Sequence, residues 1–146
     1  MTRSEQLYYE GRFFILSCFL VGILVYFLAP PLLIRKTYFK QITALPGEVV
    51  TWTAEEYWWR QCPAIVQGLW LDERTNLIVA ADKPIEGGSN PASFARQVND
   101  YKKQIPFTTI FGKELPKRLC YQTLTKHRCG GILLSSKSPI ACLTIQ

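Results

Sequence analysis

An uninterrupted apolar run near the start of the chain constrains the fold more than any other feature. Residues 13 to 34 (FFILSCFLVGILVYFLAPPLLI) contain no charged side chain. At a helical rise of ~1.5 Å per residue, about 20 apolar residues cross the ~30 Å hydrocarbon core of a bilayer. The run predicts a single membrane-spanning helix, so the lipid bilayer is the first expected partner of this chain.

The anchor divides the chain into four predicted parts. Residues 1–12 form a polar N-terminal tail, 13–34 the transmembrane anchor, 35–46 a membrane-proximal linker with a first strand, and 47–146 a soluble domain. Pro30-Pro31 is expected to end the helix, because proline blocks the intrahelical hydrogen bond. No small-residue cleavage site follows the run, which favours an uncleaved signal-anchor over a removed signal peptide.

Four cysteines outside the anchor indicate the compartment: Cys62, Cys120, Cys129 and Cys142. An even number in a small domain beyond a membrane span predicts two disulfides in an oxidising compartment. Their spacings include no C-x2-C pair, so we expect no metal site. The charges that flank the anchor weakly favour the opposite orientation. Giving the cysteines more weight, we predict a cytoplasmic N-terminus and an extracytoplasmic (periplasmic) domain, or a chain in the internal membrane of a virion.

The soluble part has the pattern of a mostly-β domain, with short alternating stretches separated by turn residues. The predicted strands are 37–45, 49–62, 64–71, 77–81, 105–112, 117–129 and the two halves of 132–146, which is broken at Ser138-Pro139. Residues 82–91 have the composition of a loop, and 91–104 form either a short helix or an irregular strand. Six or seven such strands favour an immunoglobulin-like antiparallel β-sandwich.

Within 49–62 the alternation breaks at Glu55-Glu56. A bulge there would reset the parity, so that one of Trp58 and Trp59 faces the core. The two best-defined strands each end in a cysteine, Cys62 and Cys129. Together with Trp70, they match the disulfide and the tryptophan of an immunoglobulin-like sandwich.

A hairpin turn at Gly130-Gly131 would place residue 120 opposite residue 141, and so Cys120 nearly opposite Cys142. Four cysteines allow three pairings. The pairing that we favour joins Cys62 to Cys129 and Cys120 to Cys142.

Three short motifs carry a resemblance to a known class of proteins. They are Arg60-Gln61-Cys62 at a strand end, Trp70-Leu71-Asp72 in the next strand, and a late cysteine before a Ser-Pro turn and a terminal strand. The chain resembles small single-pass proteins of bacteriophage and prophage-like genomes, which carry an immunoglobulin-like sandwich outside the membrane. The extra pair Cys120 and Cys142 departs from that pattern. The resemblance implies a fold and a setting, and it assigns no functional residue.

Two surfaces are candidates for contact with a partner. Tyr57, Trp58, Trp59 and Arg60 form a possible aromatic platform for sugar rings or a protein, the alternative being that these rings belong to the core. The final third of the chain, residues 102–146, carries eight Lys or Arg against one Glu. Its candidate basic surface comprises Lys113, Lys117, Arg118, Lys126 and Arg128. These residues are scattered over turns, which favours a solvated surface, and nucleic acid is not an expected partner.

Nothing in the sequence singles out a catalytic site. His127 is the one histidine, and it lies two residues from Cys129, which we expect to be oxidised. Glu55 and Glu56 are adjacent, so on a strand they point in opposite directions and make a poor acid–base pair. No phosphate-binding glycine loop or nucleophile motif is present. We therefore expect no cofactor and no enzymatic role.

Taken together, the sequence predicts a membrane-anchored interaction or structural module. It would dock to another membrane protein or to an envelope, virion or secretion component, and a homo-oligomer is compatible with this. One alternative is a structural protein of a membrane-containing virus particle. Another, of a different class, is an envelope-associated enzyme or enzyme inhibitor.

Overall fold

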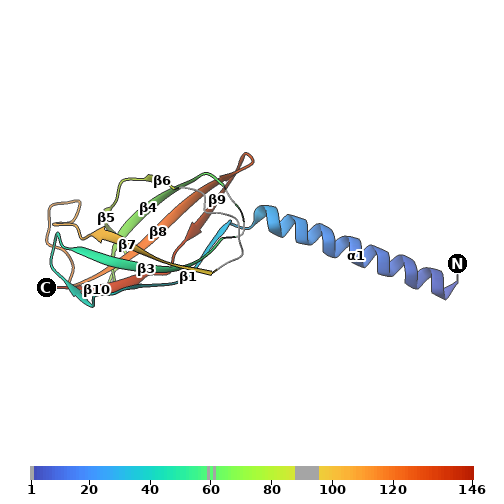
Figure 1. Cartoon of the computed structure of the whole chain (residues 1–146), viewed down its shortest axis with the longest axis horizontal. Helices are drawn as coiled ribbons and strands as arrows, with labels where there is room; N and C mark the ends of the chain where they lie inside the picture. Colours follow the sequence, from blue (N-terminus) through green and yellow to red (C-terminus); the bar gives the residue numbers. More distant parts are fainter. Residues whose placement is uncertain (1, 59, 61, 88–95) are drawn as a thin grey trace.

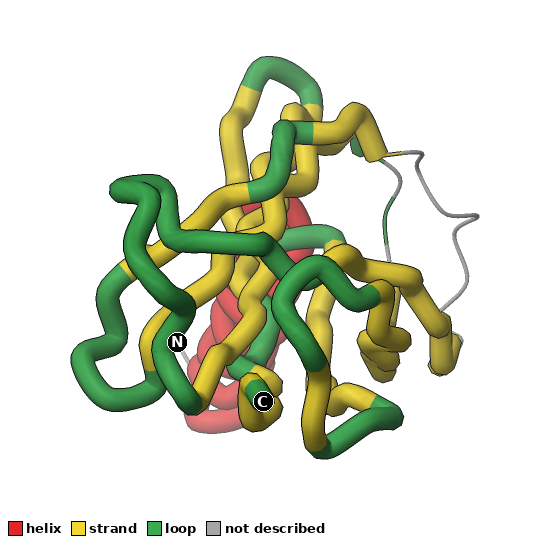
Figure 2. The backbone as a smooth tube through the Cα atoms, turned by 90° about the vertical axis from the view of Figure 1, so that its left-hand side faces the viewer, coloured by secondary structure: helices red, strands yellow, loops and turns green. Residues whose placement is uncertain are grey.

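The computed structural model describes residues 2–58, 60, 62–87 and 96–146, and it consists of one long helix and a mostly-β domain (Figure 1). Helix α1 (Arg3–Leu28) projects from one end of the β domain, and the C-terminus lies at the opposite end. Viewed from that opposite end, the helix lies behind the strands (Figure 2). We refer to the two ends of the β domain as the helix end and the far end.

Helix α1 has no buried residue, so nearly all of its surface is exposed. Among the described residues it is the one helix that is long and apolar enough to cross a membrane. It begins at Arg3, within the segment predicted as a tail, because Thr2 and Glu5 form a capping box that satisfies its first amides. It ends at Leu28, and its C-cap residue Ala29 directly precedes Pro30-Pro31, as expected.

The first sheet has three antiparallel strands in the order β1-β3-β7. They are β1 (Leu32–Phe39), β3 (Val49–Trp58) and β7 (Arg96–Gln104). Leu32 and Ile34 belong to the predicted anchor, yet both are buried in the core of the β domain. The anchor boundary at residue 34 is therefore wrong, because the two prolines end the helix and the residues after them pair with β3.

The second sheet is built on two long central strands, β4 (Ala64–Asp72) and β8 (Arg118–Cys129). Two short strands, β5 (Ile78–Ala81) and β6 (Ile85–Gly87), line the free side of β4. On the other side, β8 pairs with β9 (Ile132–Lys137) and β10 (Ala141–Ile145). The sheet is mixed, because β2 (Thr43–Ala44) runs parallel to β10.

The structure decides one alternative that local pattern left open and contradicts one prediction. Residues 96–104 form a strand and not a helix, because β7 pairs with β3 along its whole length; residues 91–95 lie outside the described residues. The stretch 105–112, predicted as a strand, is irregular. There Ile105 is fully buried and Pro106 has no amide to donate, and the residues that follow close a turn in which the Thr109 amide donates to Lys113 O at 2.9 Å.

Two predicted boundaries also shift. The stretch predicted as one strand over 37–45 is divided between β1 and β2. Residues 85–87, predicted as loop, pair with β4 as β6. Both differences arise because pairing with a neighbouring strand, and not local composition, decides where a ladder begins.

Large aromatic side chains fill the space between the two sheets. The Tyr121 ring lies 5.2 Å from the Trp52 ring and 4.6 Å from the Trp70 ring, centroid to centroid, and Phe39 stacks on Trp70 at 6.2 Å. Asp82 accepts hydrogen bonds from Trp70 Nε1 (3.3 Å) and the Tyr121 hydroxyl (3.2 Å). Aromatic rings from both sheets thus make the centre of one continuous core.

The disulfides are Cys62–Cys129 and Cys120–Cys142, the pairing favoured from the sequence. Both bonds join neighbouring strands of the second sheet, since Cys62 extends the β4–β8 ladder and Cys120 pairs with Cys142 between β8 and β10. This differs from immunoglobulin domains, in which the disulfide joins the two sheets beside a tryptophan. Trp70 packs against Tyr121, far along β4 from Cys62.

The register of the last hairpin explains how Cys120 meets Cys142. Gly130 and Gly131 both have positive φ, 59° and 84°, as a tight hairpin turn requires, and Cys129 faces Ile132 as predicted. The irregular step around Ser138-Pro139 then shifts the pairing by one residue. Cys142, and not residue 141, therefore stands directly opposite Cys120.

Candidate functional site

A hollow of about 350 Å³ lies between the two sheets, and we call it the intersheet cleft. Its apolar lining residues are Leu32, Ile34, Trp58, Ala64, Val66 and Ile85. Its lining residues with polar atoms are Trp52, Glu56, Tyr101, Lys103, Thr123 and Thr125. A hollow with mostly apolar walls and a few convergent polar groups has the composition of a small-molecule site.

Glu56 points into the cleft because β3 alternates without interruption. Residues 50, 52, 54, 56 and 58 all face the core and are buried. The bulge expected at Glu55-Glu56 lies instead in the partner strand, between Ile34 and Lys36 of β1. The extra residue of β1 absorbs the irregularity, so β3 keeps its parity and places a carboxylate in the core.

Three donors hold the Glu56 carboxylate, which is only 5% exposed. Oε1 accepts from the Tyr101 hydroxyl at 2.8 Å, and Oε2 accepts from Trp58 Nε1 and Asn99 Nδ2, both at 3.1 Å. Burial raises the pKa of the Tyr101 hydroxyl well above its usual value, and the nearby Glu56 charge raises it further. Tyr101 therefore stays protonated at neutral pH and remains a donor to Glu56.

Two residues that line the cleft each hold a buried polar atom with no hydrogen-bond partner among the described residues. The atoms are Trp52 Nε1 and Thr123 Oγ1, on residues that are 2% and 4% exposed. A buried donor without a partner costs roughly 1–3 kcal/mol, so such atoms are uncommon in folded proteins. At the Trp52 end of the cleft, a donor nitrogen and a hydroxyl therefore lack a hydrogen-bond partner among the described residues.

Lys103 is the cationic side chain that lines the cleft. Its Nζ lies 5.5 Å from the Tyr121 ring centroid and 6.0 Å from that of Tyr101. In the described parts of the chain, the ion pairs are Lys40–Asp100, Arg96–Glu55 and Arg118–Glu73. Lys103 therefore lies over aromatic rings, and no carboxylate of the described residues is within ion-pair distance of it.

The aromatic platform predicted at residues 57–60 is divided among different environments. Tyr57 is half-buried and donates to Glu55 at 3.0 Å, whereas Trp58 lies in the cleft and donates to Glu56. Trp59 lies outside the described residues. A single flat platform is not formed by the members that the structure describes, because alternation along β3 sends Tyr57 and Trp58 to opposite faces.

Arg60 instead joins the β domain to the helix. Its Nη2 donates to the carbonyl oxygens of Phe27 (3.1 Å) and Ala29 (3.4 Å). Its guanidinium also lies over the Tyr26 ring, 5.5 Å from the centroid. A cation near the last carbonyls of a helix is favourable, because those groups have no intrahelical donor.

The predicted basic surface forms two separate groups at opposite ends of β8. Lys113, Lys117 and Arg118 lie in or next to the loop that precedes β8, and Lys126 and Arg128 lie near its other end. Arg128 shares a hollow with Phe27 of α1, which places its group at the helix end. All five side chains are exposed, and no continuous basic patch connects the two groups.

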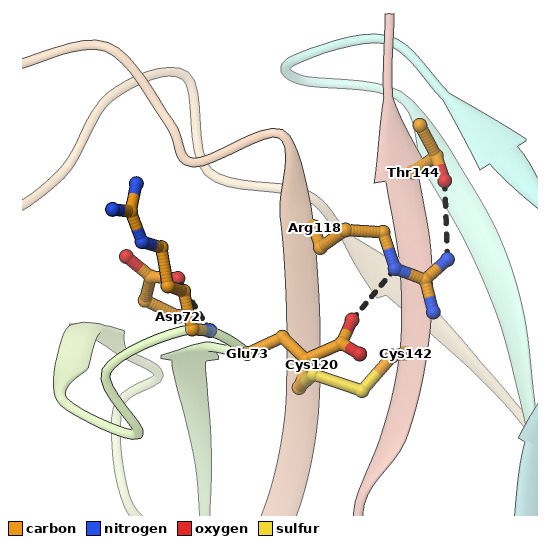
Figure 3. Close-up of polar contacts among 7 residues, drawn as sticks. Asp72, Glu73, Arg118, Cys120, Cys142 and Thr144 are labelled. Carbon is orange, nitrogen blue, oxygen red and sulfur yellow. Dashed lines mark hydrogen bonds and ion pairs between the residues drawn. A yellow bond between two sulfur atoms is a disulfide. The ribbon is translucent and has the colours of Figure 1, made fainter.

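At the far end, Arg118 donates from Nε to Glu73 Oε2 at 2.6 Å and from Nη1 to Thr144 Oγ1 at 3.1 Å (Figure 3). The Glu73 carboxylate lies within 4.8 Å of the sulfurs of Cys120 and Cys142. Those sulfurs are joined in a disulfide, so they provide no thiolate for a metal ion. The ion pair covers the disulfide and gives this corner a structural role.

His127 is fully buried on the core face of β8. Its Nε2 hydrogen-bonds the Ser136 hydroxyl at 2.9 Å, and its ring packs edge-on against Trp58 at 6.1 Å. Burial, and to a lesser extent the Arg60 charge, lowers the pKa of His127 below its usual value. Cys129 is oxidised, so His127 has no thiol to activate.

The comparisons with known proteins show similarity of fold only. No protein-family model and no curated protein sequence matches the chain. One similar solved structure is the alkylpurine DNA glycosylase AlkC of Pseudomonas fluorescens bound to DNA containing an abasic site analog, at 14% identity and TM-score 0.47. Another is the sporulation control protein Spo0M of Bacillus subtilis, at 13% identity and TM-score 0.43.

Each match covers 80% of this chain, but only 30% of the glycosylase chain and 50% of the Spo0M chain. The chain thus spans half or less of these structures. One of them is an enzyme, which contradicts our expectation that this chain has no enzymatic role. That expectation is withdrawn; the similarity is confined to the fold and transfers no activity.

Sequence reasoning missed the residues that make the cleft polar, namely Glu56, Tyr101 and Lys103. One signal was available for Glu56: the alternation from Val50 to Ala54, continued without a bulge, places Glu56 and Trp58 on the core face. The positions of Tyr101 and Lys103 on a core-facing strand could not be predicted, because their segment also matched a helical spacing. No local signal shows that all three residues meet in one cavity.

Proposed function

We propose that this chain is a membrane-anchored, extracytoplasmic binding domain that holds a small, mainly apolar molecule in the intersheet cleft. The observation that carries the proposal is that two residues lining the cleft, Trp52 and Thr123, each hold a buried polar atom, Nε1 and Oγ1, with no hydrogen-bond partner among the described residues. A ligand with an acceptor at that end would satisfy them and remove their desolvation penalty. The apolar walls would supply the rest of the binding free energy.

The proposed location follows from the helix and the disulfides. Helix α1 is long and apolar enough to serve as the anchor, and the β domain carries two disulfides of the kind that form in oxidising compartments. Arg60 holds the β domain close to the last turn of the helix. A ligand in the cleft would therefore be held close to the outer surface of the membrane.

The location is tested by labelling cysteines in intact cells with a membrane-impermeant maleimide. We expect no labelling of the β domain without a reductant, and labelling of Cys62, Cys120, Cys129 and Cys142 after an impermeant reductant is added. Labelling that requires permeabilised cells but no reductant would place the domain in the cytoplasm and refute this part of the proposal.

Binding is tested by methyl NMR on the full chain in lipid nanodiscs, with cyclohexanol as a neutral probe. We expect saturable shifts of the Ile34, Val66 and Ile85 methyl signals, which line the cleft. The Leu77 methyls, on an exposed turn, serve as the internal control. Val66→Trp fills the cleft and should abolish the saturable shifts. Shifts of equal size in Leu77, or shifts that Val66→Trp leaves unchanged, would refute the cleft as a binding site.

A docking role remains a second proposal, and the place of β7 in its sheet supports it. Among the described residues β7 is the last strand in the order β1-β3-β7, and the docking mode that we propose is addition of a partner strand beside it. An envelope, secretion or virion component is the partner inferred from the sequence, and the phage setting belongs to this proposal. Purified virions or envelope complexes that contain the chain in fixed stoichiometry would support it. Its absence from both would refute it.

A further inference from the structure

We propose that the ligand of the intersheet cleft is an amphiphile with a single carboxylate head and one short apolar tail. The head would lie between Trp52, Lys103 and Thr123, and the tail would extend towards Trp58. This inference rests on the proposed function and adds the chemical class and the orientation of the ligand.

The head-group end is defined by three residues near Tyr121 whose side chains carry donors. The Trp52 ring and Lys103 Nζ lie 5.2 Å and 5.5 Å from the centre of the Tyr121 ring, and Thr123 is the next core-facing residue of the same strand. Trp52 Nε1 is a donor only, the Lys103 ammonium is a donor only, and the Thr123 hydroxyl is able to donate. A ligand group that accepts several hydrogen bonds matches this set of side chains, with the partly exposed Lys103 ammonium as its charged partner.

Charge decides between an anionic and a cationic ligand. Two tryptophans, a tyrosine and a carboxylate around one hollow also resemble the cage that binds quaternary ammonium groups. Here the Lys103 ammonium already lies over the Tyr101 and Tyr121 rings, so a second cation would meet like charge. Glu56 already accepts three hydrogen bonds, so its carboxylate is stabilised without a bound cation.

Glu56 and Lys103 occupy different positions along the sheet relative to Trp52. Glu56 lies four residues beyond Trp52 on β3, a separation of about 13 Å between Cα atoms at the usual rise of a strand. Lys103 belongs to the strand next to Trp52, where Val50 pairs with Lys103 and Trp52 pairs with Tyr101. In backbone position, Lys103 therefore lies on the side of Trp52 that is away from Glu56.

The tail end and the cleft volume limit the apolar part. Leu32, Trp58 and Ala64 line the cleft away from the donors, with Val66 opposite Thr125 and paired with Ile85 of β6. The volume of about 350 Å³ is near the lower limit of ~300 Å³ for small-molecule sites. It suits one short chain or ring, and it is too small for a lipid with two long chains.

The test uses methyl NMR on the full chain in nanodiscs with three eight-carbon probes: octanoate, octanol and octylamine. Octanoate should give saturable shifts of Ile34 and Val66, with an affinity at least tenfold higher than that of octylamine. Acetate, which has the head without the tail, should give none. Dodecanoate delivered from the bilayer, compared with octanoate from solution, distinguishes a lipid-derived acid from a soluble one.

Lys103→Met keeps the length of the side chain and removes its charge. It should weaken octanoate binding at least tenfold and abolish the preference for octanoate over octylamine. Lys102→Met, on the exposed face of the same strand, is the matched control and should change neither. Thr123→Val provides a second, isosteric variant and should weaken octanoate more than octanol.

Octylamine binding as tightly as octanoate to the unmodified chain would overturn the inference, and so would a Lys103→Met variant with unchanged octanoate affinity. Saturable cyclohexanol binding without octanoate binding would leave the proposed function in place and refute only the acidic head group. The absence of any saturable shift with all probes would refute both.

Discussion

Replacement of Gly68 by alanine should strongly destabilise the β domain. Gly68 is buried on the core face of β4, and a Cβ atom there would overlap the Tyr121 hydroxyl and the Asp82 carboxylate. These are the two groups that hydrogen-bond each other at 3.2 Å in the centre of the core. The methyl group has no free space, so Tyr121, Asp82 or the strand itself must move.

The expected size follows from the two effects of that movement. Overpacking of a core costs roughly 1–3 kcal/mol, and a lost hydrogen bond to a charged group costs about 1.5–3 kcal/mol. Taking about 3 kcal/mol for the sum after partial relaxation, the melting temperature should fall by about 12 °C, at ~4 °C per kcal/mol for a domain of this size.

The assay is thermal unfolding of the full chain in nanodiscs, followed by near-ultraviolet circular dichroism, which reports the packed aromatic rings. Gly22→Ala in α1 is the control, because a Cβ atom added there meets nothing within 4 Å. It should leave the melting temperature within about 2 °C. A Gly68→Ala variant that melts within 2 °C of the unmodified chain would show that Tyr121 and Asp82 adjust freely, and the reasoning would be refuted.

Three further outcomes are expected. Replacing Cys62 and Cys129 by alanine should lower the free energy of unfolding by about 4 kcal/mol, because the disulfide closes a loop with a sequence separation of 67 residues. Equilibrium unfolding in urea measures this loss, and a loss below about 1 kcal/mol would contradict the prediction. His127 has a lowered pKa in the fold, so the unfolded state binds more protons and stability should fall as pH drops below about 6.5, by at most ~1.4 kcal/mol per pH unit. His127→Gln should flatten that part of the pH–stability curve, and an unchanged slope would assign it to other groups. Arg60→Met should raise hydrogen exchange of the amides after the helix end about tenfold, whereas Arg74→Met, on an exposed turn, should leave it unchanged.

The sequence by itself determined the features that depend on neighbouring residues. The apolar run and Pro30-Pro31 located the helix and its end, since span length and proline geometry are local properties. Alternation and turn residues located β3, β4 and β8, and the Gly130-Gly131 hairpin brought Cys120 near Cys142. For this disulfide, the fold decided only the one-residue shift in strand pairing around Ser138-Pro139.

The tertiary structure alone decided where the strands without a clear period belong and which polar residues are enclosed. Residues 96–104 match a helix in spacing, and they form a strand because β3 offers a continuous ladder of partners. Glu56 is buried because β1, and not β3, carries the extra residue. The cleft brings Trp52, Lys103 and Thr123 together from three strands of two sheets. Contacts between residues so distant in sequence depend on how the sheets pack, and no local pattern encodes that packing.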